Sequence, residues 1–373
     1  MHHTISTHRR SRRTTLLAGL AATALLTAGC ASGGTDDPAA EPEADGTTTP
    51  GDGGGKVVLA THGSWYVPDE VVAAFEEQTG YELEVTSVGD AGELTNRLVL
   101  TKDRPIADAV FGIDNTFATR AVDEGVLEEY TPEALPESAE QYALDGDGTD
   151  QLTPVDWSDV CVNIDDEWFA DNDVEPPATL DDLLDPAYRD LFVTPAASSS
   201  SPGFAFLLAT IGKFGDGGWQ QYWIDLMDNG ARLTSGWSDA YEVDFTAGGG
   251  DGDRPIVLSY SSSPPFTIPE GGDEPTTSAL LDTCFRQVEY AGVLAGAENP
   301  EGAQALVDFM VAADFQSALP ENMYVFPVDE DTELPELWAQ WAETAEEPIE
   351  VDPAEVAENR DDWIREWSDL TSG

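Results

Sequence analysis

The sequence predicts an α/β protein built as two lobes, and three observations support this fold class. From residue 56 onward, apolar runs of strand length alternate with segments of helical periodicity, which is typical of a largely parallel sheet. Residues 56–373 are numerous enough for two lobes of ordinary size. Several of the expected strands run directly into polar loops, and in such sheets ligands bind at the carboxyl ends of the strands.

The first lobe is expected over residues 56–155. Its elements alternate as strand, helix, strand, helix and strand, at Lys56–Trp65, Val71–Thr79, Tyr81–Val88, Glu93–Lys102 and Ala107–Ile113. Gly80 ends the first helix, and Asp114 follows the last strand. The loops that follow these three strands are therefore expected to meet at one edge of the sheet.

The second lobe is expected over residues 156–285. Its predicted elements are a helix around Leu180–Leu184, a strand ending near Ser198, a helix from Phe204 onward and a strand at Val257–Tyr260. A strand at Arg286–Leu294 then returns the chain to the first lobe, which residues 286–373 are expected to complete. That last part contains two amphipathic helices, at Glu301–Ala312 and Glu355–Trp367.

The N-terminal region has the features of an export signal. Four arginines precede the apolar stretch Leu16–Ala28, which is short for a membrane span and ends in Leu-Thr-Ala-Gly-Cys. That ending resembles a bacterial lipobox, so residues 1–29 are predicted to be a lipoprotein signal peptide and Cys30 the lipidated residue. The alternatives are an ordinary signal peptide and a buried hydrophobic helix. The paired arginines leave the general and twin-arginine export routes both open.

Residues 30–55 are predicted to be a flexible acidic linker, since they are rich in Gly, Pro, Thr, Asp and Glu and lack aromatic residues. Together with the lipid on Cys30, this linker would hold the folded domain outside the cytoplasm, anchored to the cell membrane. Cys161 and Cys284 are the remaining cysteines, and in an oxidising compartment they are predicted to form a disulfide. Two separate buried thiols are the alternative.

The charge balance excludes one class of partner. The chain has 16 Lys and Arg against 73 Asp and Glu, a net charge of −57, which argues against nucleic acid as a ligand. The same balance is compatible with a cationic ligand. Acidic residues spread along a whole chain are, however, more often a means of staying soluble in salty surroundings.

No catalytic motif is present, and His62 is the only histidine outside residues 1–29. The sequence therefore predicts a protein that is not an enzyme and has neither a histidine-based metal site nor a cofactor. Three hydroxyl-rich loops remain as candidate binding segments: Ser198–Gly203, Thr234–Tyr241 and Leu258–Phe266.

The Ser198–Gly203 loop opens a helix, so it could bind an anion or simply supply an N-cap. Trp237, Tyr241, Tyr260 and Phe266, in the other two loops, suit a planar cationic ring. Their alternative role is as core residues at the ends of loops.

Six blocks of residues carry a family resemblance: Asp90 with Leu94–Leu98, Gly112–Asn115, Pro154–Trp157, Ser199–Gly203, Gly236–Tyr241 and Leu258–Pro264. In residue type and spacing they resemble the thiamine-binding periplasmic proteins, over about residues 57–368. The resemblance implies a two-lobed, type II periplasmic-binding-protein-like fold, each lobe a mixed sheet flanked by helices, with the ligand in the cleft between the lobes. It also implies a monomeric substrate-binding lipoprotein that captures thiamine or a thiamine phosphate for an ABC transporter permease.

The same resemblance implies a set of ligand-binding residues: His62, Ser64, Asp90, Ala91, Asp114, Ser200, Ser201, Trp237, Tyr260, Ser261, Ser262, Ser263, Phe266 and Tyr324. Ser200 and Ser201 would hold a phosphate or hydroxyl tail, and Trp237 would stack on a ring. Four positions depart from the family pattern. His62 and Phe266 stand where tyrosines are usual, Tyr324 where a tryptophan is usual, and Ala91 where a glycine is usual. These departures leave the choice among thiamine, its monophosphate and its diphosphate open.

Two other ligands remain possible for the same fold. A ferric-ion-binding protein would use adjacent tyrosines with carboxylates, whereas Tyr260 is followed by Ser261. A polyamine-binding protein would share an acidic and aromatic cleft, and composition alone does not separate it from a thiamine-binding protein.

Overall fold

The computed structural model describes residues 54–144, 148 and 150–372. The expected signal peptide, Cys30 and nearly all of the linker over residues 30–55 lie outside the described residues, so these assignments stay predictions. Within the described part, no helix combines the length and apolar character needed to cross a membrane.

The first lobe is built around three parallel strands. β1 (Gly55–Thr61) lies between β2 (Tyr81–Ser87) and β3 (Ala109–Asp114). Helices α1 (Asp69–Thr79) and α2 (Ala91–Thr101) connect these strands, which confirms the strand and helix order predicted for this lobe. Gly80 ends α1 in a left-handed conformation with φ of 77°, which glycine adopts without steric cost.

The second lobe is built around a second set of parallel strands. β5 (Phe192–Pro195) lies between β6 (Arg232–Thr234) and β7 (Ile256–Tyr260). Helix α5 (Ser201–Phe214) is buried over most of its length, and it packs against α6 (Gly218–Asp228). The sequence predicted α5 and β7 but not α6.

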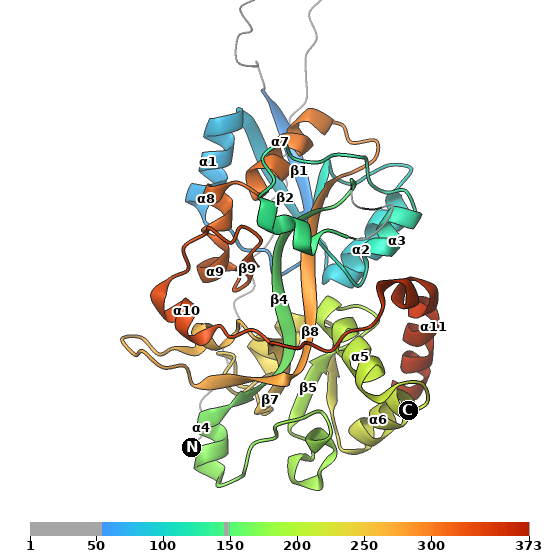
Figure 1. Cartoon of the computed structure of the whole chain (residues 1–373), viewed down its shortest axis with the longest axis vertical. Helices are drawn as coiled ribbons and strands as arrows, with labels where there is room; N and C mark the ends of the chain where they lie inside the picture. Colours follow the sequence, from blue (N-terminus) through green and yellow to red (C-terminus); the bar gives the residue numbers. More distant parts are fainter. Residues whose placement is uncertain (1–53, 145–147, 149, 373) are drawn as a thin grey trace, which may run out of the picture. The chain divides into compact units, whose positions relative to one another are not determined.

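Two long antiparallel strands join the lobes. β4 (Thr153–Asp165) and β8 (Thr277–Val293) pair along their length, as Figure 1 shows near the centre of the described part. One end of β8 pairs with β3 of the first lobe, and one end of β4 pairs with β7 of the second. The strand order is β2-β1-β3-β8-β4-β7-β5-β6, with the two-residue strand β9 (Phe326–Pro327) paired to β4. The predicted two-lobed α/β fold with crossing strands is thereby confirmed.

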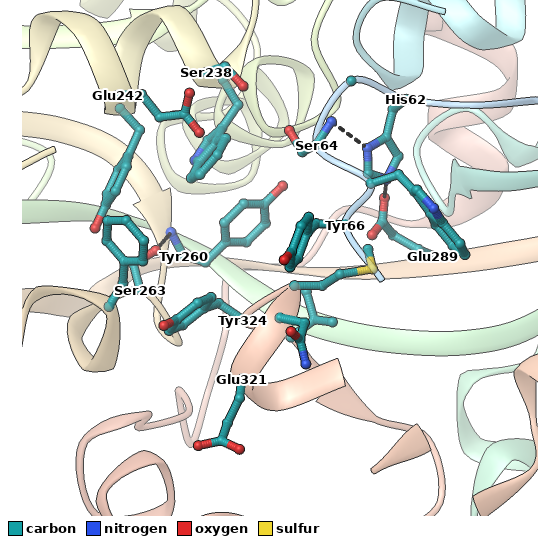
Figure 2. Close-up of a pocket in the computed structure, with 18 residues that line it drawn as sticks. His62, Ser64, Tyr66, Ser238, Glu242, Tyr260, Ser263, Glu289, Glu321 and Tyr324 are labelled. Carbon is teal, nitrogen blue, oxygen red and sulfur yellow. Dashed lines mark hydrogen bonds and ion pairs between the residues drawn. The ribbon is translucent and has the colours of Figure 1, made fainter. Parts of the chain in front are cut away.

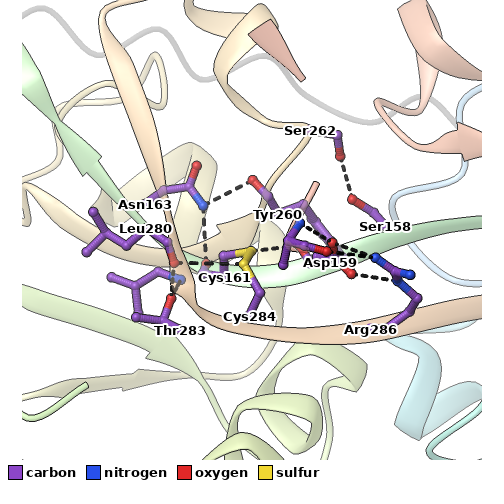
Figure 3. Close-up of a disulfide and its surroundings, with 12 residues drawn as sticks. Ser158, Asp159, Cys161, Asn163, Tyr260, Ser262, Leu280, Thr283, Cys284 and Arg286 are labelled. Atoms are coloured by element: carbon purple, nitrogen blue, oxygen red, sulfur yellow. Dashed lines mark hydrogen bonds and ion pairs between the residues drawn. A yellow bond between two sulfur atoms is a disulfide. The ribbon is translucent and has the colours of Figure 1, made fainter. Parts of the chain in front are cut away.

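A disulfide links the crossing strands. Cys161 on β4 and Cys284 on β8 are fully buried and bonded, with their Cα atoms 4.2 Å apart. The predicted disulfide is therefore confirmed, although both cysteines lie inside the strands rather than beside them. The neighbouring residues on the same strands, Asp159 and Arg286, form an ion pair, which Figure 3 also shows. Its nitrogen and oxygen atoms are 2.8 Å apart.

Further helices and turns complete the described part of the chain. The helices are α3 (Ala118–Asp123), α4 (Asp166–Asn172), α7 (Pro300–Met310), α8 (Ala313–Gln316), α9 (Leu319–Asn322), α10 (Glu336–Trp341) and α11 (Pro353–Thr371). Short 3₁₀ or π-helices occur at Glu137–Tyr142, Asp182–Leu184, Pro186–Tyr188, Asp239–Asp244 and Pro264–Thr267. The helix predicted around Leu180–Leu184 is present only as the single 3₁₀ turn Asp182–Leu184. Asp185, the residue before Pro186, is extended, because proline disfavours helical backbone in the residue before it, so the helix ends there.

Helix α11 contacts both lobes. The ring of Trp367 lies 5.4 Å from that of Trp223 on α6, in the second lobe. The guanidinium of Arg360 lies 4.2 Å from the ring centre of Phe117 in the first lobe and 5.4 Å from that of Phe204 in the second. The sequence assigned all of residues 286–373 to the first lobe, whereas α11 spans the two.

Candidate functional site

A cavity of about 560 Å³ lies where the two lobes meet. Its walls come from the loop after β1, the turn after β6, the end of β7 with the turn that follows, β8 and the segment around α9 (Figure 2). The residues that line it are His62, Gly63, Ser64, Trp65, Tyr66, Trp237, Ser238, Tyr241, Glu242, Tyr260, Ser263, Phe266, Glu289, Glu321, Asn322, Met323, Tyr324 and Val325.

Aromatic rings form much of the cavity wall. The ring of Trp237 stacks on that of Tyr241, with centroids 5.0 Å apart and planes inclined by 13°. The indole Nε1–H of Trp237 donates to Ser259 Oγ at 3.0 Å, which fixes the orientation of the ring. Phe266 and Tyr324 meet edge to face at 5.3 Å. These rings offer π faces on which a planar ligand can stack, and a cationic ring gains most from such stacking.

The charged side chains that line the cavity are nearly all acidic. Glu242, Glu289 and Glu321 are carboxylates, and the lining includes neither Lys nor Arg. His62 is the one titratable base among the lining residues, and its Nε2 lies 3.2 Å from Glu289 Oε1. Because the cavity is rich in carboxylates and aromatic rings, it suits an organic cation better than an anion.

Buried acids surround Glu289. Asp156 on β4 is fully buried, and neither of its carboxylate oxygens has a hydrogen-bond partner among the residues that the structure describes. Burial, reinforced by the nearby charge of Glu289, raises the pKa of Asp156 well above its ordinary value. Burial also raises the pKa of Asp114 to about 7, even though Thr116 and Phe117 donate hydrogen bonds to its carboxylate.

Asp90 joins the two lobes. It caps α2, where Oδ1 accepts from the N–H of Ala91 at 2.7 Å. The same carboxylate accepts from two N–H groups of the second lobe, those of Ser201 at 3.3 Å and Trp237 at 2.9 Å. The backbones also approach closely beside it, since a Cβ on Gly92 would lie 2.8 Å from the carbonyl oxygen of Ser199. The lobes are therefore in a closed arrangement around the cavity.

The predicted ligand-binding residues divide into two groups. Seven of them line the cavity: His62, Ser64, Trp237, Tyr260, Ser263, Phe266 and Tyr324. The other seven lie outside its lining: Asp90, Ala91, Asp114, Ser200, Ser201, Ser261 and Ser262. The predicted binding roles of both groups stay predictions.

Residues of the second group have structural partners. The hydroxyl of Ser262 bonds that of Ser158 at 2.7 Å and the carbonyl of Tyr324 at 2.6 Å, which ties the Ser261–Ser263 turn to β4 and to the α9 segment. Ser200 caps α5 by accepting from the N–H of Gly203. The N–H of Ser201, expected to be free for an anionic ligand, instead donates to Asp90.

Several lining residues were not predicted. Tyr66 and Glu289 are the most informative, because one is a 61% exposed aromatic ring and the other a buried carboxylate. Glu289 lies between Val288 and Tyr290, and it is the one charged residue in the otherwise apolar last part of β8, Val288–Val293. A charged residue in such a strand is a signal that could have identified it, since an isolated buried carboxylate is costly. Among the described residues, no cluster of three or more His, Cys, Asp or Glu is placed to hold a metal ion.

Comparison with known proteins gives a consistent result. Residues 70–346 match the family model of the bacterial extracellular solute-binding proteins. A thiamine-binding periplasmic protein of Escherichia coli K12 is 31% identical over 318 residues, which cover 83% of this chain and 90% of that protein. The corresponding protein of Brucella abortus is 29% identical, and the match covers 85% of this chain and 92% of that protein.

Solved structures have the same fold. A periplasmic thiamin binding protein superimposes with a TM-score of 0.74 and 28% identity, covering 85% of this chain and 96% of that one. A ferric binding protein from Campylobacter jejuni gives a TM-score of 0.65 at 15% identity, covering 84% and 99%. At that identity the second match shows a shared fold only.

Proposed function

This chain belongs to the bacterial extracellular solute-binding proteins, and we propose that it captures thiamine or a thiamine phosphate outside the cytoplasm and delivers it to the permease of an ABC importer. The role is capture rather than catalysis. The lipid on Cys30 would keep the protein at the membrane, and the protein would act as a monomer without a cofactor.

The composition of the cavity wall is the observation that carries this proposal. Thiamine joins an aminopyrimidine to a permanently cationic thiazolium ring. Trp237, Tyr241, Tyr260 and Phe266 supply aromatic surface for two such rings, and Glu289 supplies a buried negative charge. An uncharged or anionic ligand would gain much less from this combination.

Closure of the lobes would couple capture to delivery. The hydrogen bonds from Ser201 and Trp237 to Asp90 exist only when the lobes are together, so they stabilise the closed form. A ligand that contacts both lobes shifts the population toward that form. A permease that binds only the closed form would then bind the ligand-loaded protein in preference to the ligand-free protein.

A fluorescence titration tests the proposal against its two rivals. Trp237 lies in the cavity, so a bound ligand should change tryptophan emission. We expect saturable binding of thiamine and none of spermidine or ferric iron. Binding of spermidine alone would favour the polyamine alternative, and binding of ferric iron alone would favour the ferric alternative.

Replacing Trp237 by alanine is expected to weaken thiamine binding tenfold or more. The reason is that stacking of a desolvated cationic ring contributes about 1–2 kcal/mol, and each 1.4 kcal/mol is about tenfold in affinity. Trp363→Ala is the matched control, because Trp363 is a buried core residue on α11 and does not line the cavity. Calorimetry on both folded variants measures the effect, and an unchanged affinity for Trp237→Ala would remove this ring from the site.

Thiamine and thiamine monophosphate are expected to bind within about tenfold of each other, a difference of about 1.4 kcal/mol or less. The cavity lining contains no Lys or Arg to pair with a phosphate, and neutral donors hold an anion less strongly than charged ones. Calorimetry with both ligands at one salt concentration measures the ratio. A preference for the phosphate far above tenfold would mean that a cation reaches the site from elsewhere.

A further inference from the structure

A buried histidine and a buried glutamate face each other in the cavity wall. His62 follows β1 and Glu289 lies on β8, and each is only 7% exposed. Figure 2 shows the imidazole between two partners, Glu289 on one side and Ser64 on the other. Its Nε2 lies 3.2 Å from Glu289 Oε1, and its Nδ1 accepts a hydrogen bond from the N–H of Ser64 at 3.2 Å.

These two contacts fix where the imidazole proton lies. An Nδ1 that accepts from Ser64 carries no proton, so the imidazole in this arrangement is neutral, with its proton on Nε2 toward Glu289. Protonation would place a second N–H on Nδ1, directly opposite the N–H of Ser64. The protonated form therefore loses the hydrogen bond that holds Ser64, which itself lines the cavity.

Protonation also changes the charge that a ligand meets. A neutral His62 leaves the negative charge of Glu289 available to a ligand cation, whereas an imidazolium neutralises it. The other ionisable groups around the pair are Asp156 on β4, Asp114 at the end of β3, Asp90 before α2 and Tyr260 on β7. None of these groups becomes positively charged, so His62 is the only group of this cluster whose protonation brings a positive charge to Glu289.

We propose that His62 and Glu289 form a proton-controlled cation site, in which a ligand cation replaces the His62 proton as the partner of Glu289. On this proposal, which rests on the proposed function, the thiazolium is the part of the ligand that Glu289 recognises. Binding and protonation exclude each other, so His62 releases one proton from Nδ1 to solvent as the ligand enters.

The sign of the pH dependence follows. Burial lowers the pKa of His62, but the attraction of Glu289, Asp90 and Asp114 outweighs burial and raises that pKa above 6.5. Affinity for the cation is then constant above the raised pKa and falls by up to about tenfold for each pH unit below it. We expect thiamine to bind about tenfold or more weakly at pH 5.5 than at pH 8.

Calorimetry on the full chain with thiamine tests the proposal in two ways. Dissociation constants at pH 5.5 and pH 8 give the pH dependence, and titrations near pH 6.5 in two buffers of different ionisation heat give the number of protons released. We expect a fractional release that approaches one proton. Equal affinities at the two pH values with no proton release would overturn the proposal while leaving thiamine capture intact.

Two variants assign the proton. His62→Gln keeps an N–H toward Glu289 and cannot be protonated, so its affinity is expected to be nearly the same at both pH values. Asp114→Asn removes a neighbouring carboxyl group whose pKa lies near neutrality, and it is expected to retain the pH dependence. Loss of the pH dependence in Asp114→Asn and its survival in His62→Gln would overturn the proposal. If His62→Gln does not fold, the wild-type proton release together with the Asp114→Asn result still decides whether His62 is the group that releases the proton.

Failure of the wild type to bind thiamine at either pH would overturn the proposed function, and this inference with it.

Discussion

Replacing Cys161 and Cys284 together by alanine is expected to lower the free energy of unfolding by about 5 kcal/mol, because the disulfide closes a long loop in the unfolded chain. The two cysteines are 123 residues apart in sequence, and loop-closure entropy grows with that separation. The bond also links β4 to β8 where their pairing shifts register between Val160 and Val162, so it supports the ladder at an irregular point.

Urea denaturation measures this loss as a lower midpoint, with a steeper slope because the unfolded chain without the crosslink exposes more surface. The control is a reductant, which should destabilise the wild type and leave the double alanine variant unaffected. Thiamine affinity should change little, because neither cysteine lines the cavity. A loss of stability below about 1 kcal/mol would mean that the crossing strands hold the lobes together without the bond.

Local sequence patterns were sufficient for much of the fold. The strands of the first lobe and helices α1, α2, α7 and α11 have clear periodicity, and the structure confirms them. The pattern was insufficient where polar residues enter a strand. β8 begins at Thr277, nine residues before the predicted start at Arg286. Its first part was missed because it includes polar residues such as the partly exposed Ser278 and the exposed Asp282.

The site residues were predictable only where several of them lie together in one loop. Trp237 and Tyr260 stand in Gly/Ser-rich loops whose composition suggests a ligand, and both line the cavity. His62 and Glu289 are more than two hundred residues apart in the sequence. They meet because β8 pairs with β3, the neighbour of β1, and no local pattern predicts that pairing. The family resemblance predicts Asp90 as a ligand contact, and the structure adds its hydrogen bonds between the lobes, which no local pattern indicates.

That position of Asp90 leads to the second large expected effect. Asp90→Ala is expected to weaken thiamine binding about 100-fold, since each hydrogen bond to a charged group contributes about 1.5–3 kcal/mol and two of them close the lobes. The carboxylate also caps α2 through the N–H of Ala91, so a smaller loss of stability, about 1 kcal/mol, should accompany the change. Calorimetry with thiamine measures the affinity.

Two further measurements separate closure from direct contact with the ligand. Asp185→Ala removes a comparable cap, because Asp185 accepts from the N–H of Ala187 in an exposed turn, and it should leave affinity unchanged. Small-angle scattering of the ligand-free protein should give a larger radius of gyration for Asp90→Ala than for the wild type, since the open form becomes favoured. If Asp90→Ala binds weakly but remains as compact as the wild type, Asp90 acts on the ligand directly. If the folded variant binds thiamine as tightly as the wild type, the closed arrangement does not depend on this carboxylate, and contacts such as those of Arg360 with Phe117 and Phe204 must hold the lobes together instead.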